Sequence, residues 1–257
     1  MDLGLAGRVA LVMGSSQGLG YACAASLARE GAHVVLTGRH RQSLEASCDA
    51  IRAAGGRASI HVADFQDMTP LFGIKKDIAD VDIVVTNCGG PPPGDAAHID
   101  MADLDRYFTA MVRVPIATVE MYLPGMRQRK FGRIINIISS GVLQPIANLA
   151  LSNTLRPALV GWAKTLSVEV AADGVTVNSV VPGRIHTRRV DSLNVAAAAR
   201  QGRPVEDVSR ASRDAIPMKR YGDPAEFADM VTFLASARAG YVTGTLVRVD
   251  GGLVGSL

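Results

Sequence analysis

An apolar run over residues 8–13 leads directly into Gly14-Ser15-Ser16-Gln17-Gly18-Leu19-Gly20, and a helical pattern over residues 19–30 follows. Glycines between a strand and a helix let the backbone turn tightly and approach a pyrophosphate, and the first N–H groups of the helix then face the phosphates. The stretch therefore predicts a dinucleotide-binding turn, formed by Gly14, Ser15, Gln17, Gly18, Leu19 and Gly20. A tight connection that binds no ligand is the alternative interpretation.

The alternation of short apolar runs and longer helical patterns continues to the end of the chain. Runs rich in Val and Ile, typical of strands covered on both faces, lie at residues 8–13, 33–37, 58–61, 83–86, 133–138, 176–180 and 245–249. Helical patterns lie at residues 19–30, 42–54, 69–79, 102–129, 151–172 and 224–235. Because crossovers between parallel strands are right-handed, this order predicts an α/β fold, a Rossmann-type doubly wound seven-stranded parallel sheet with helices on both faces. No linker interrupts the pattern, so residues 1–257 are predicted to form a single dinucleotide-binding domain.

Residues 184–220 are the exception, because they break this alternation between the sixth strand and the last helix and are long for a connection. We predict that they form a substrate lid. The segment carries nine basic side chains against four acidic ones. This excess predicts attraction of an anionic substrate, or of the phosphopantetheine of an acyl carrier, although a solvated helix surface would also explain it.

Composition narrows the classes of protein and partner. The 257-residue chain is 48% hydrophobic, and no run approaches the roughly 18 apolar residues of a membrane span. The N-terminus has no charged-then-apolar export pattern, so we expect a cytoplasmic protein. Cys23, Cys48 and Cys88 have no metal-binding spacing, which argues against a metal site and a disulfide framework. A formal charge of +3 without a lysine-rich tract argues against nucleic acid as a partner.

The end of the second strand predicts which dinucleotide is bound. Proteins of this architecture that bind NAD place a carboxylate there for the ribose hydroxyls, whereas this chain has Thr37-Gly38-Arg39-His40. Arg39 can form charge-assisted hydrogen bonds with a 2′-phosphate, and Ser15 offers a further donor. The cofactor predicted from these residues is NADP(H), with a solvated surface arginine as the alternative interpretation of Arg39.

Further motifs lie where such a fold would use them. Asn87-Cys88-Gly89-Gly90 follows the fourth strand, Asn178 and Pro182-Gly183 belong to the sixth, and Asp250-Gly251-Gly252 lies near the C-terminus. Together with the glycine turn, they make the chain resemble the short-chain dehydrogenase/reductase family over nearly its whole length, and within it the 3-oxoacyl-[acyl-carrier-protein] reductase-like members. The resemblance implies that Asp64 binds the adenine. It also implies further cofactor-binding residues, namely Asn87, Gly89, Pro182, Gly183 and Ile185.

The sequence departs from this family at the catalytic centre, which the family builds from asparagine, serine, tyrosine and lysine. Ser139, after the fifth strand, matches the family serine, and Ser140 is the nearby alternative. Thirteen residues further on, where the family's YxxxK begins, the chain has Ser152-Asn153-Thr154-Leu155-Arg156. Met111 stands where the asparagine is expected, and its apolar side chain predicts a core position. Tyrosine, lysine and asparagine are therefore all missing.

These replacements change the chemistry that the centre can perform. The family tyrosine exchanges a proton with the substrate oxygen, and the neighbouring lysine lowers its pKa. A serine hydroxyl is a far weaker acid than a phenol, and arginine stays protonated, so neither replaces that exchange. Ser152 and Arg156 are one turn apart on a helix and share a face. Arg156 is predicted to hold the nicotinamide ribose, while Ser139 and Ser152 donate to a developing oxyanion. The alternative is that Ser152 and Arg156 only pin the helix.

Other residues near the expected site offer a few more candidates. Asp95, His98 and His186 are the nearby titratable groups that would serve as a substitute acid or base. Cys88 is expected beside the cofactor without acting as a nucleophile, since no basic residue adjoins it in sequence. Pro91-Pro92-Pro93-Gly94 is expected to stiffen one wall of the pocket. The apolar lining predicted for that pocket is Leu143, Pro145, Ile146, Leu149, Val195 and residues 196–199.

Three functions are consistent with these residues. The first is an NADPH-dependent reductase of a carbonyl or other polarised double bond, acting on a small-molecule or acyl substrate that is anionic or carrier-bound. The second is a non-redox enzyme such as a cyclase, lyase or isomerase, and the third is an NADP(H)-binding protein without catalysis. The family resemblance also implies a homotetramer or homodimer, with Leu155, Leu159, Trp162 and Leu166 forming an interface stripe or, alternatively, part of the core.

Overall fold

The strands form one parallel sheet. The computed structural model describes residues 1–256, apart from the side chains of residues 70–72. Its seven-stranded sheet has the order β3-β2-β1-β4-β5-β6-β7, and every neighbouring pair is parallel. The strands are β1 (Val9–Val12), β2 (His33–Gly38), β3 (Arg57–Val62), β4 (Ile83–Thr86), β5 (Gly132–Ile137), β6 (Val175–Pro182) and β7 (Leu246–Val249). The order reverses between β1 and β4, so the doubly wound prediction is confirmed.

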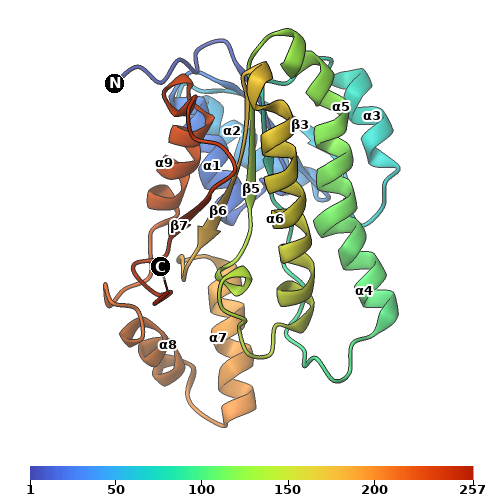
Figure 1. Ribbon diagram of the computed structural model, residues 1–257. Helices are drawn as coiled ribbons and strands as arrows, with labels where there is room; N and C mark the ends of the chain where they lie inside the picture. Colours follow the sequence, from blue (N-terminus) through green and yellow to red (C-terminus); the bar gives the residue numbers. More distant parts are fainter. Residues whose placement is uncertain (257) are drawn as a thin grey trace.

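Helices cover both faces of the sheet (Figure 1). They are α1 (Gly18–Arg29), α2 (Arg41–Ala53), α3 (Pro70–Asp77), α4 (Met101–Phe108), α5 (Val114–Gln128), α6 (Ala150–Val170), α7 (Arg188–Gln201), α8 (Val205–Asp214) and α9 (Pro224–Ala235). Short 3₁₀ turns lie at Ser140–Val142, Ala171–Asp173 and Ala237–Ala239. Among the described helices, none is long and apolar enough to cross a membrane.

Two apolar clusters hold these layers together, one on each face of the sheet. On one face, α1, α2 and α9 pack through side chains such as Leu27, Ile51 and Phe227. On the other, α5 and α6 pack through side chains such as Tyr122 and Val170. Successive residues of β1 point to opposite clusters, as a strand buried on both sides requires.

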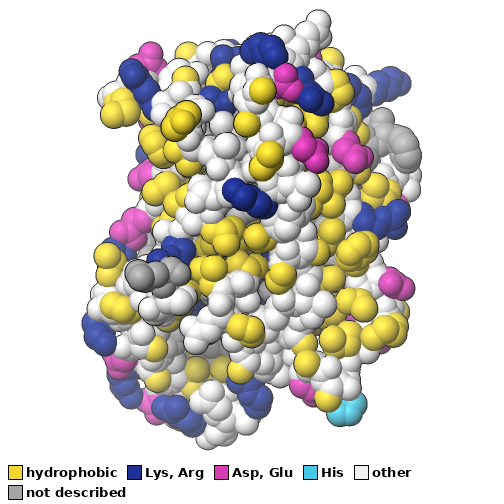
Figure 2. All heavy atoms as spheres, viewed as in Figure 1, with side chains coloured by type: hydrophobic (Ala, Val, Ile, Leu, Met, Phe, Trp, Pro, Cys, Tyr) yellow, Lys and Arg dark blue, Asp and Glu magenta, His cyan; other side chains and the backbone are white. Residues whose placement is uncertain are grey.

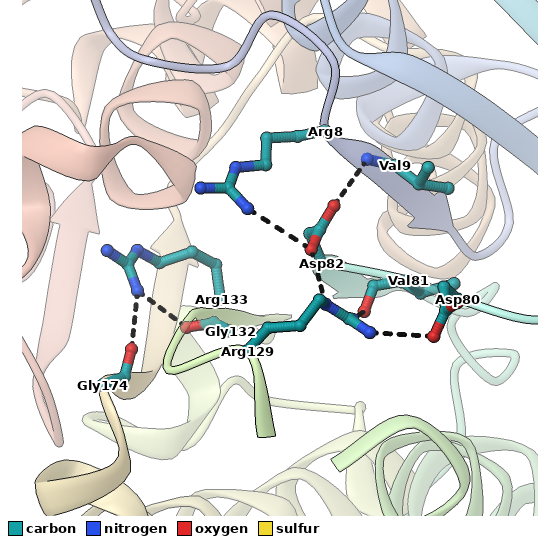
Figure 3. A network of polar contacts seen from close by, with 9 residues as sticks. All are labelled: Arg8, Val9, Asp80, Val81, Asp82, Arg129, Gly132, Arg133 and Gly174. Carbon is teal, nitrogen blue, oxygen red and sulfur yellow. Dashed lines mark hydrogen bonds and ion pairs between the residues drawn. The ribbon is translucent and has the colours of Figure 1, made fainter. Parts of the chain in front are cut away.

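A network of ion pairs and hydrogen bonds ties the amino ends of the central strands together (Figure 3). Asp82, just before β4, pairs with Arg8 at 3.6 Å and with Arg129 at 3.2 Å, and it accepts from the Val9 amide at 3.1 Å. The Arg133 side chain donates to the carbonyls of Gly132 and Gly174, while burial lowers its pKa to about 10. This network lies at the end of the sheet opposite to the carboxyl ends of the strands.

The helix predicted over residues 102–129 is not one regular helix. A π-helical segment, Thr109–Arg113, separates α4 from α5. Met111 belongs to this segment and is 2% exposed, packed with Val112 and Leu155. The prediction that Met111 is a core residue is therefore confirmed.

The predicted lid contains two helices that the sequence pattern did not reveal, α7 and α8, which extend beyond the carboxyl ends of the strands (Figure 1). The ends of the segment are bonded to each other, because the Gly222 amide donates to the Arg184 carbonyl and the His186 amide donates to the Gly222 carbonyl, each at 2.9 Å. Residues 184–220 therefore leave and rejoin the domain at one place.

The stripe on α6 lies in the interior of the chain. Leu155, Leu159 and Leu166 are each less than 10% exposed, and half-buried Trp162 packs against the same core. The three leucines of this stripe are therefore core residues, as the core interpretation predicts. Hydrophobic side chains that do reach the surface gather near the middle of the face in Figure 2, beside α6 and over β7. Val168 on α6 and Leu246 on β7 are among the exposed large hydrophobic residues.

Candidate active site

A cavity of about 1460 Å³ opens at the carboxyl ends of the strands. Its walls come from the glycine turn, the ends of β2 to β6, the start of α6 and the first turn of α7. The predicted site residues that line it are Gly14, Gln17, Gly18, Leu19, Arg39, Asp64, Asn87, Gly89, Ser139, Ser152, Arg156, Pro182, Gly183 and Ile185. Ligands of open α/β sheets bind at this edge, next to the point where the strand order reverses.

The glycine turn has a geometry that only glycine allows. Gly14 and Gly18 have φ values of +57° and +59°. A Cβ atom on Gly20 would lie 2.3 Å from the Gly14 carbonyl oxygen, which explains why Gly20 is required although it does not line the cavity. The turn also leaves the N-terminus of α1 facing the cavity without a side-chain cap. These residues fit a pyrophosphate bound by backbone N–H groups.

Two residues, Arg39 and Ser15, were predicted to bind the 2′-phosphate. Arg39, at the end of β2, is the one of this pair that lines the cavity. Arg39 is exposed and lines it, and its Nε donates to His40 at 3.1 Å. Ser15 is fully buried; its hydroxyl donates to the Val12 carbonyl and accepts from the Thr37 amide. The prediction of Ser15 as a phosphate donor is therefore wrong. Ser16 and Ser43 line the cavity beside Arg39 instead.

Asn87 and Asn178 act through contacts with backbone. The Asn87 side-chain amide donates to the Gly14 carbonyl at 3.0 Å, so it fixes the glycine turn against the end of β4. Asn178 is buried and its side-chain amide donates to the Val242 carbonyl at 2.8 Å. Asn178 does not line the cavity, and its bond to Val242 holds the loop before β7. Pro182 and Gly183 border the cavity directly.

All three predicted catalytic residues line the cavity, and two of them are in contact. Arg156 donates through Nε to the Ser152 hydroxyl at 3.3 Å and through Nη1 to the Ile137 carbonyl at 3.0 Å. Ser139 accepts from the Gly141 amide at 3.1 Å at the start of a 3₁₀ turn. All three side chains line the cavity, so these contacts orient them without removing them from the site.

Known proteins resemble this chain in sequence over nearly its whole length. The family model described as enoyl-(acyl carrier protein) reductase matches residues 14–254. The NADPH-dependent reductase BacG of Bacillus subtilis is 31% identical over 97% of this chain and 99% of its own length. The 3-oxoacyl-[acyl-carrier-protein] reductase FabG of Rickettsia conorii is 30% identical over 97% of this chain and 98% of its own length. The chain belongs to the short-chain dehydrogenase/reductase family.

Solved structures support the same membership of the short-chain dehydrogenase/reductase family. L-Sorbose reductase of Gluconobacter frateurii, in complex with NADPH and L-sorbose, has a TM-score of 0.93 and 30% identity, and each chain is covered over 100% of its length. The family resemblance inferred from the motifs is therefore confirmed. The neighbour's cofactor also agrees with the NADP(H) predicted from the end of β2.

Electrostatics around Arg156 distinguish this reductase-family site from a neutral pocket. Burial lowers the pKa of Arg156. Burial raises the pKa of the Cys88 thiol, and the nearby Arg156 charge opposes that shift only in part. Cys88 therefore stays a thiol beside the cavity, as predicted, and Arg156 keeps its charge because arginine is not deprotonated in proteins.

Two of the three candidates for a substitute acid or base are wrong. Asp95 and His98 are exposed, pair with each other at 3.3 Å and do not line the cavity. His186 lines the cavity and stays a candidate. The predicted apolar lining is also reduced, because only Ile146 and Leu149 of that set reach the cavity. Leu143, Pro145, Val195 and residues 196–199 do not.

Residues that sequence motifs did not single out complete the site. Tyr107, from the last turn of α4, lines the cavity next to Ala110. Arg188 donates to the Gln17 side chain at 3.2 Å, and Arg189 donates to the Pro91 carbonyl at 2.6 Å. The first turn of α7 thus contacts both the glycine turn and the proline-rich loop. The basic excess of residues 184–220 was the sequence signal for these arginines, but it did not say which of them face the cavity.

Proposed function

We propose that this chain is an NADPH-dependent reductase of a polarised double bond, either a carbonyl or a conjugated carbon–carbon double bond. Its family supports an NADP(H)-dependent oxidoreductase. The observation that carries the finer proposal is that Ser139, Ser152 and Arg156 all line the cavity, with Arg156 bonded to Ser152. All three side chains are polar, line the same cavity and can donate hydrogen bonds.

The chain's residues fit NADP(H). The glycine turn offers backbone N–H groups to a pyrophosphate, and its glycines keep the approach open. Arg39 offers a cation at the end of β2, where no carboxylate opposes a 2′-phosphate. When bound, NADPH supplies the hydride for the reduction. The remaining chemistry belongs to the side chains that surround the substrate.

Ser139, Ser152 and Arg156 stabilise negative charge on the substrate oxygen. As hydride adds to the substrate carbon, the electron pair of the double bond moves toward oxygen, where these groups donate hydrogen bonds. Arg156 is held by the Ile137 carbonyl and by Ser152, so little reorganisation is needed when charge develops. Arg156 is half-buried, and its partial removal from water strengthens its interaction with an oxyanion.

The proton that completes the reduction does not come from this group. A serine hydroxyl is too weak an acid, and arginine keeps its proton. Water or the substrate supplies it after hydride transfer. Protonation after hydride transfer suits a conjugated substrate in particular. Its enolate delocalises the negative charge and is therefore more stable before protonation than a simple alkoxide.

The proposal is tested with a panel of 2-oxo acids and α,β-unsaturated acids, ketones and aldehydes, following NADPH absorbance. Once a substrate is found, Ser152→Ala and Arg156→Gln are expected to lower kcat by about 10²- to 10³-fold each, as for loss of an oxyanion donor. Thr165→Ala, an exposed hydroxyl on the same helix, is the control and keeps wild-type kcat. Unchanged turnover in Ser152→Ala and Arg156→Gln would contradict the assigned roles.

A further inference from the structure

Two arginines from different elements line the same end of the cavity. Arg156 comes from α6 and Arg189 from the first turn of α7. Arg189 passes over Gly90, where an added Cβ would lie 3.0 Å from its Nη2, and donates to the Pro91 carbonyl at 2.6 Å. Burial lowers the pKa of Arg189, and the positive charge of Arg156 lowers it further, so the two guanidinium groups lie within electrostatic range of each other.

Neither arginine has an acidic partner among the residues that the structure describes. The hydrogen bonds of Arg156 go to a carbonyl and a hydroxyl, and that of Arg189 goes to a carbonyl. Asp64 is the only carboxylate of the described residues that lines the cavity. It follows β3, at the far edge of the sheet from β5 and α6. The two cations therefore face the cavity without compensation.

Both side chains are half-buried, so their charges are costly to hold. Burial lowers the pKa of each, and for Arg189 the repulsion from Arg156 acts in the same direction. Arginine nevertheless remains protonated, and two desolvated cations without a counter-ion destabilise the folded chain. An anion between them would relieve this cost, and this is a common basis for binding carboxylates and phosphates.

Donors remain available for such an anion. Arginine has five N–H donors in a planar fork, and within the described part of the chain Nη2 of Arg156 and Nε and Nη1 of Arg189 have no acceptor. The same cavity is lined by Tyr107, Ile146 and Leu149. The rest of the ligand that carries the anion is therefore expected to be compact and apolar or unsaturated.

We propose that Arg156 and Arg189 form a carboxylate-binding subsite, so that the substrate is a small organic acid whose carboxylate lies beside the double bond to be reduced. The identification of the bound acid as the substrate rests on the proposed function, whereas the existence of the subsite does not. A carboxylate is favoured over a phosphate because Arg156 is bonded to Ser152 at 3.3 Å. An anion on Arg156 would therefore lie directly beside the bond to be reduced, as the carboxylate of a 2-oxo acid or an α,β-unsaturated acid does. The cofactor's own phosphates are assigned to the glycine turn, and the NADP⁺ affinity of an Arg189 variant distinguishes that site from the subsite.

The test is calorimetric titration of the NADP⁺-saturated protein with benzoate and with benzamide, which has nearly the same shape without the charge. Benzoate is expected to bind at least about 10-fold more tightly than benzamide. Arg189→Met is expected to weaken benzoate binding by about 10- to 100-fold, and Arg189→Lys by less, because the charge stays while the fork is lost. Arg200→Met is the matched control, since it removes an exposed charge of the same helix outside the cavity, and it keeps wild-type affinity for benzoate.

Equal binding of benzoate and benzamide, or wild-type benzoate affinity in Arg189→Met, would overturn the proposal. So would inorganic phosphate binding more tightly than benzoate, or a loss of NADP⁺ affinity in Arg189→Met as large as the loss of benzoate affinity. Thermal melting of each variant distinguishes a lost subsite from a lost fold. If benzoate binds as expected but no acid in the panel is reduced, the subsite stands and the proposed function alone fails.

Discussion

Arg39 and Gly20 show how single residues specify the cofactor site. Arg39 is recognisable in the sequence because it replaces an expected carboxylate, and in the structure it lines the cavity at the end of β2. Gly20 is recognisable by its spacing, and its role is steric, since a Cβ would overlap the Gly14 carbonyl. Ser15 was misassigned because spacing says which residue follows the strand but not whether its hydroxyl turns inward.

Arg39→Ala is expected to weaken NADPH binding by about 10- to 100-fold while NADH binding changes little. A hydrogen bond to a charged group contributes about 1.5–3 kcal/mol, and only NADPH carries the 2′-phosphate. Calorimetric titration of both nucleotides at low salt measures the difference. Equal losses for NADPH and NADH would mean that Arg39 does not contact that phosphate.

Gly20→Ala is expected to lower the free energy of unfolding by about 1–3 kcal/mol and to weaken NADPH binding, because the glycine turn must open to admit the methyl group. Gly161→Ala is the matched control. A Cβ on that exposed helical glycine meets nothing within 4 Å, so alanine there is expected to stabilise the chain by about 0.5–1 kcal/mol. Urea unfolding measures both, and equal stability of the Gly20 variant would refute the steric argument.

At the scale of elements, regular segments were predictable and irregular ones were not. The strands follow from runs of Val and Ile and the main helices from their apolar spacing. The π segment at Thr109–Arg113 has no comparable signal, because one extra residue in a turn leaves the apolar pattern almost unchanged. Helices α7 and α8 were missed because much of their surface is polar and only a few side chains, such as Val190 and Val208, are buried.

The start of α9 is a capping box that makes stability depend on pH. Asp223 accepts from the Ala225 amide, and Glu226 accepts from the Asp223 amide and pairs with Arg220. The hydrogen bonds from Arg220, followed by that from the Asp223 amide, lower the pKa of Glu226 from 4.5 to about 2. A lowered carboxyl pKa adds stability above the unfolded value of 4.5, and that stability is lost as pH falls through about 2.

Glu226→Gln is therefore expected to reduce the slope of unfolding free energy against pH between about 4.5 and 2. Asp229→Asn, an exposed carboxyl on the same helix without an ion pair among the described residues, is the control and keeps the wild-type slope. Urea titrations at several pH values measure the slopes. Identical slopes for wild type and Glu226→Gln would show that the capping carboxyl is not coupled to folding.

At the scale of the whole molecule, one end of the sheet forms the cavity and the other end carries a network that stabilises the fold. The carboxyl ends carry the cavity, and the amino ends carry the network around Asp82 (Figure 3). Asp82→Asn is expected to lower the free energy of unfolding by about 1–3 kcal/mol, because Arg8 and Arg129 would lose a mostly buried partner. NADPH affinity is expected to stay unchanged. A parallel loss of NADPH affinity in calorimetry would contradict this division of tasks.

A homotetramer or homodimer remains a prediction. The α6 stripe that suggested it is internal, but Val168 is 73% exposed and Tyr241 is fully exposed, near the edge strand β7. Light scattering at micromolar concentration is expected to give a mass above that of the 27.0 kDa chain. Val168→Lys and Tyr241→Ser are expected to lower that mass, since they remove exposed apolar surface. A monomeric wild-type mass would reject the prediction.

The central claim is that this site transfers hydride although serine and arginine stand where its family is expected to use tyrosine and lysine. The most direct measurement is mass spectrometry of the product formed from a panel acid with NADPH deuterated at the nicotinamide C4 position. With one of the two C4 stereoisomers, each product molecule is expected to carry one deuterium. The slow product of Ser152→Ala is expected to carry the same label. Product formed without deuterium from either C4 stereoisomer would contradict the account, because the site would then convert its substrate without reduction.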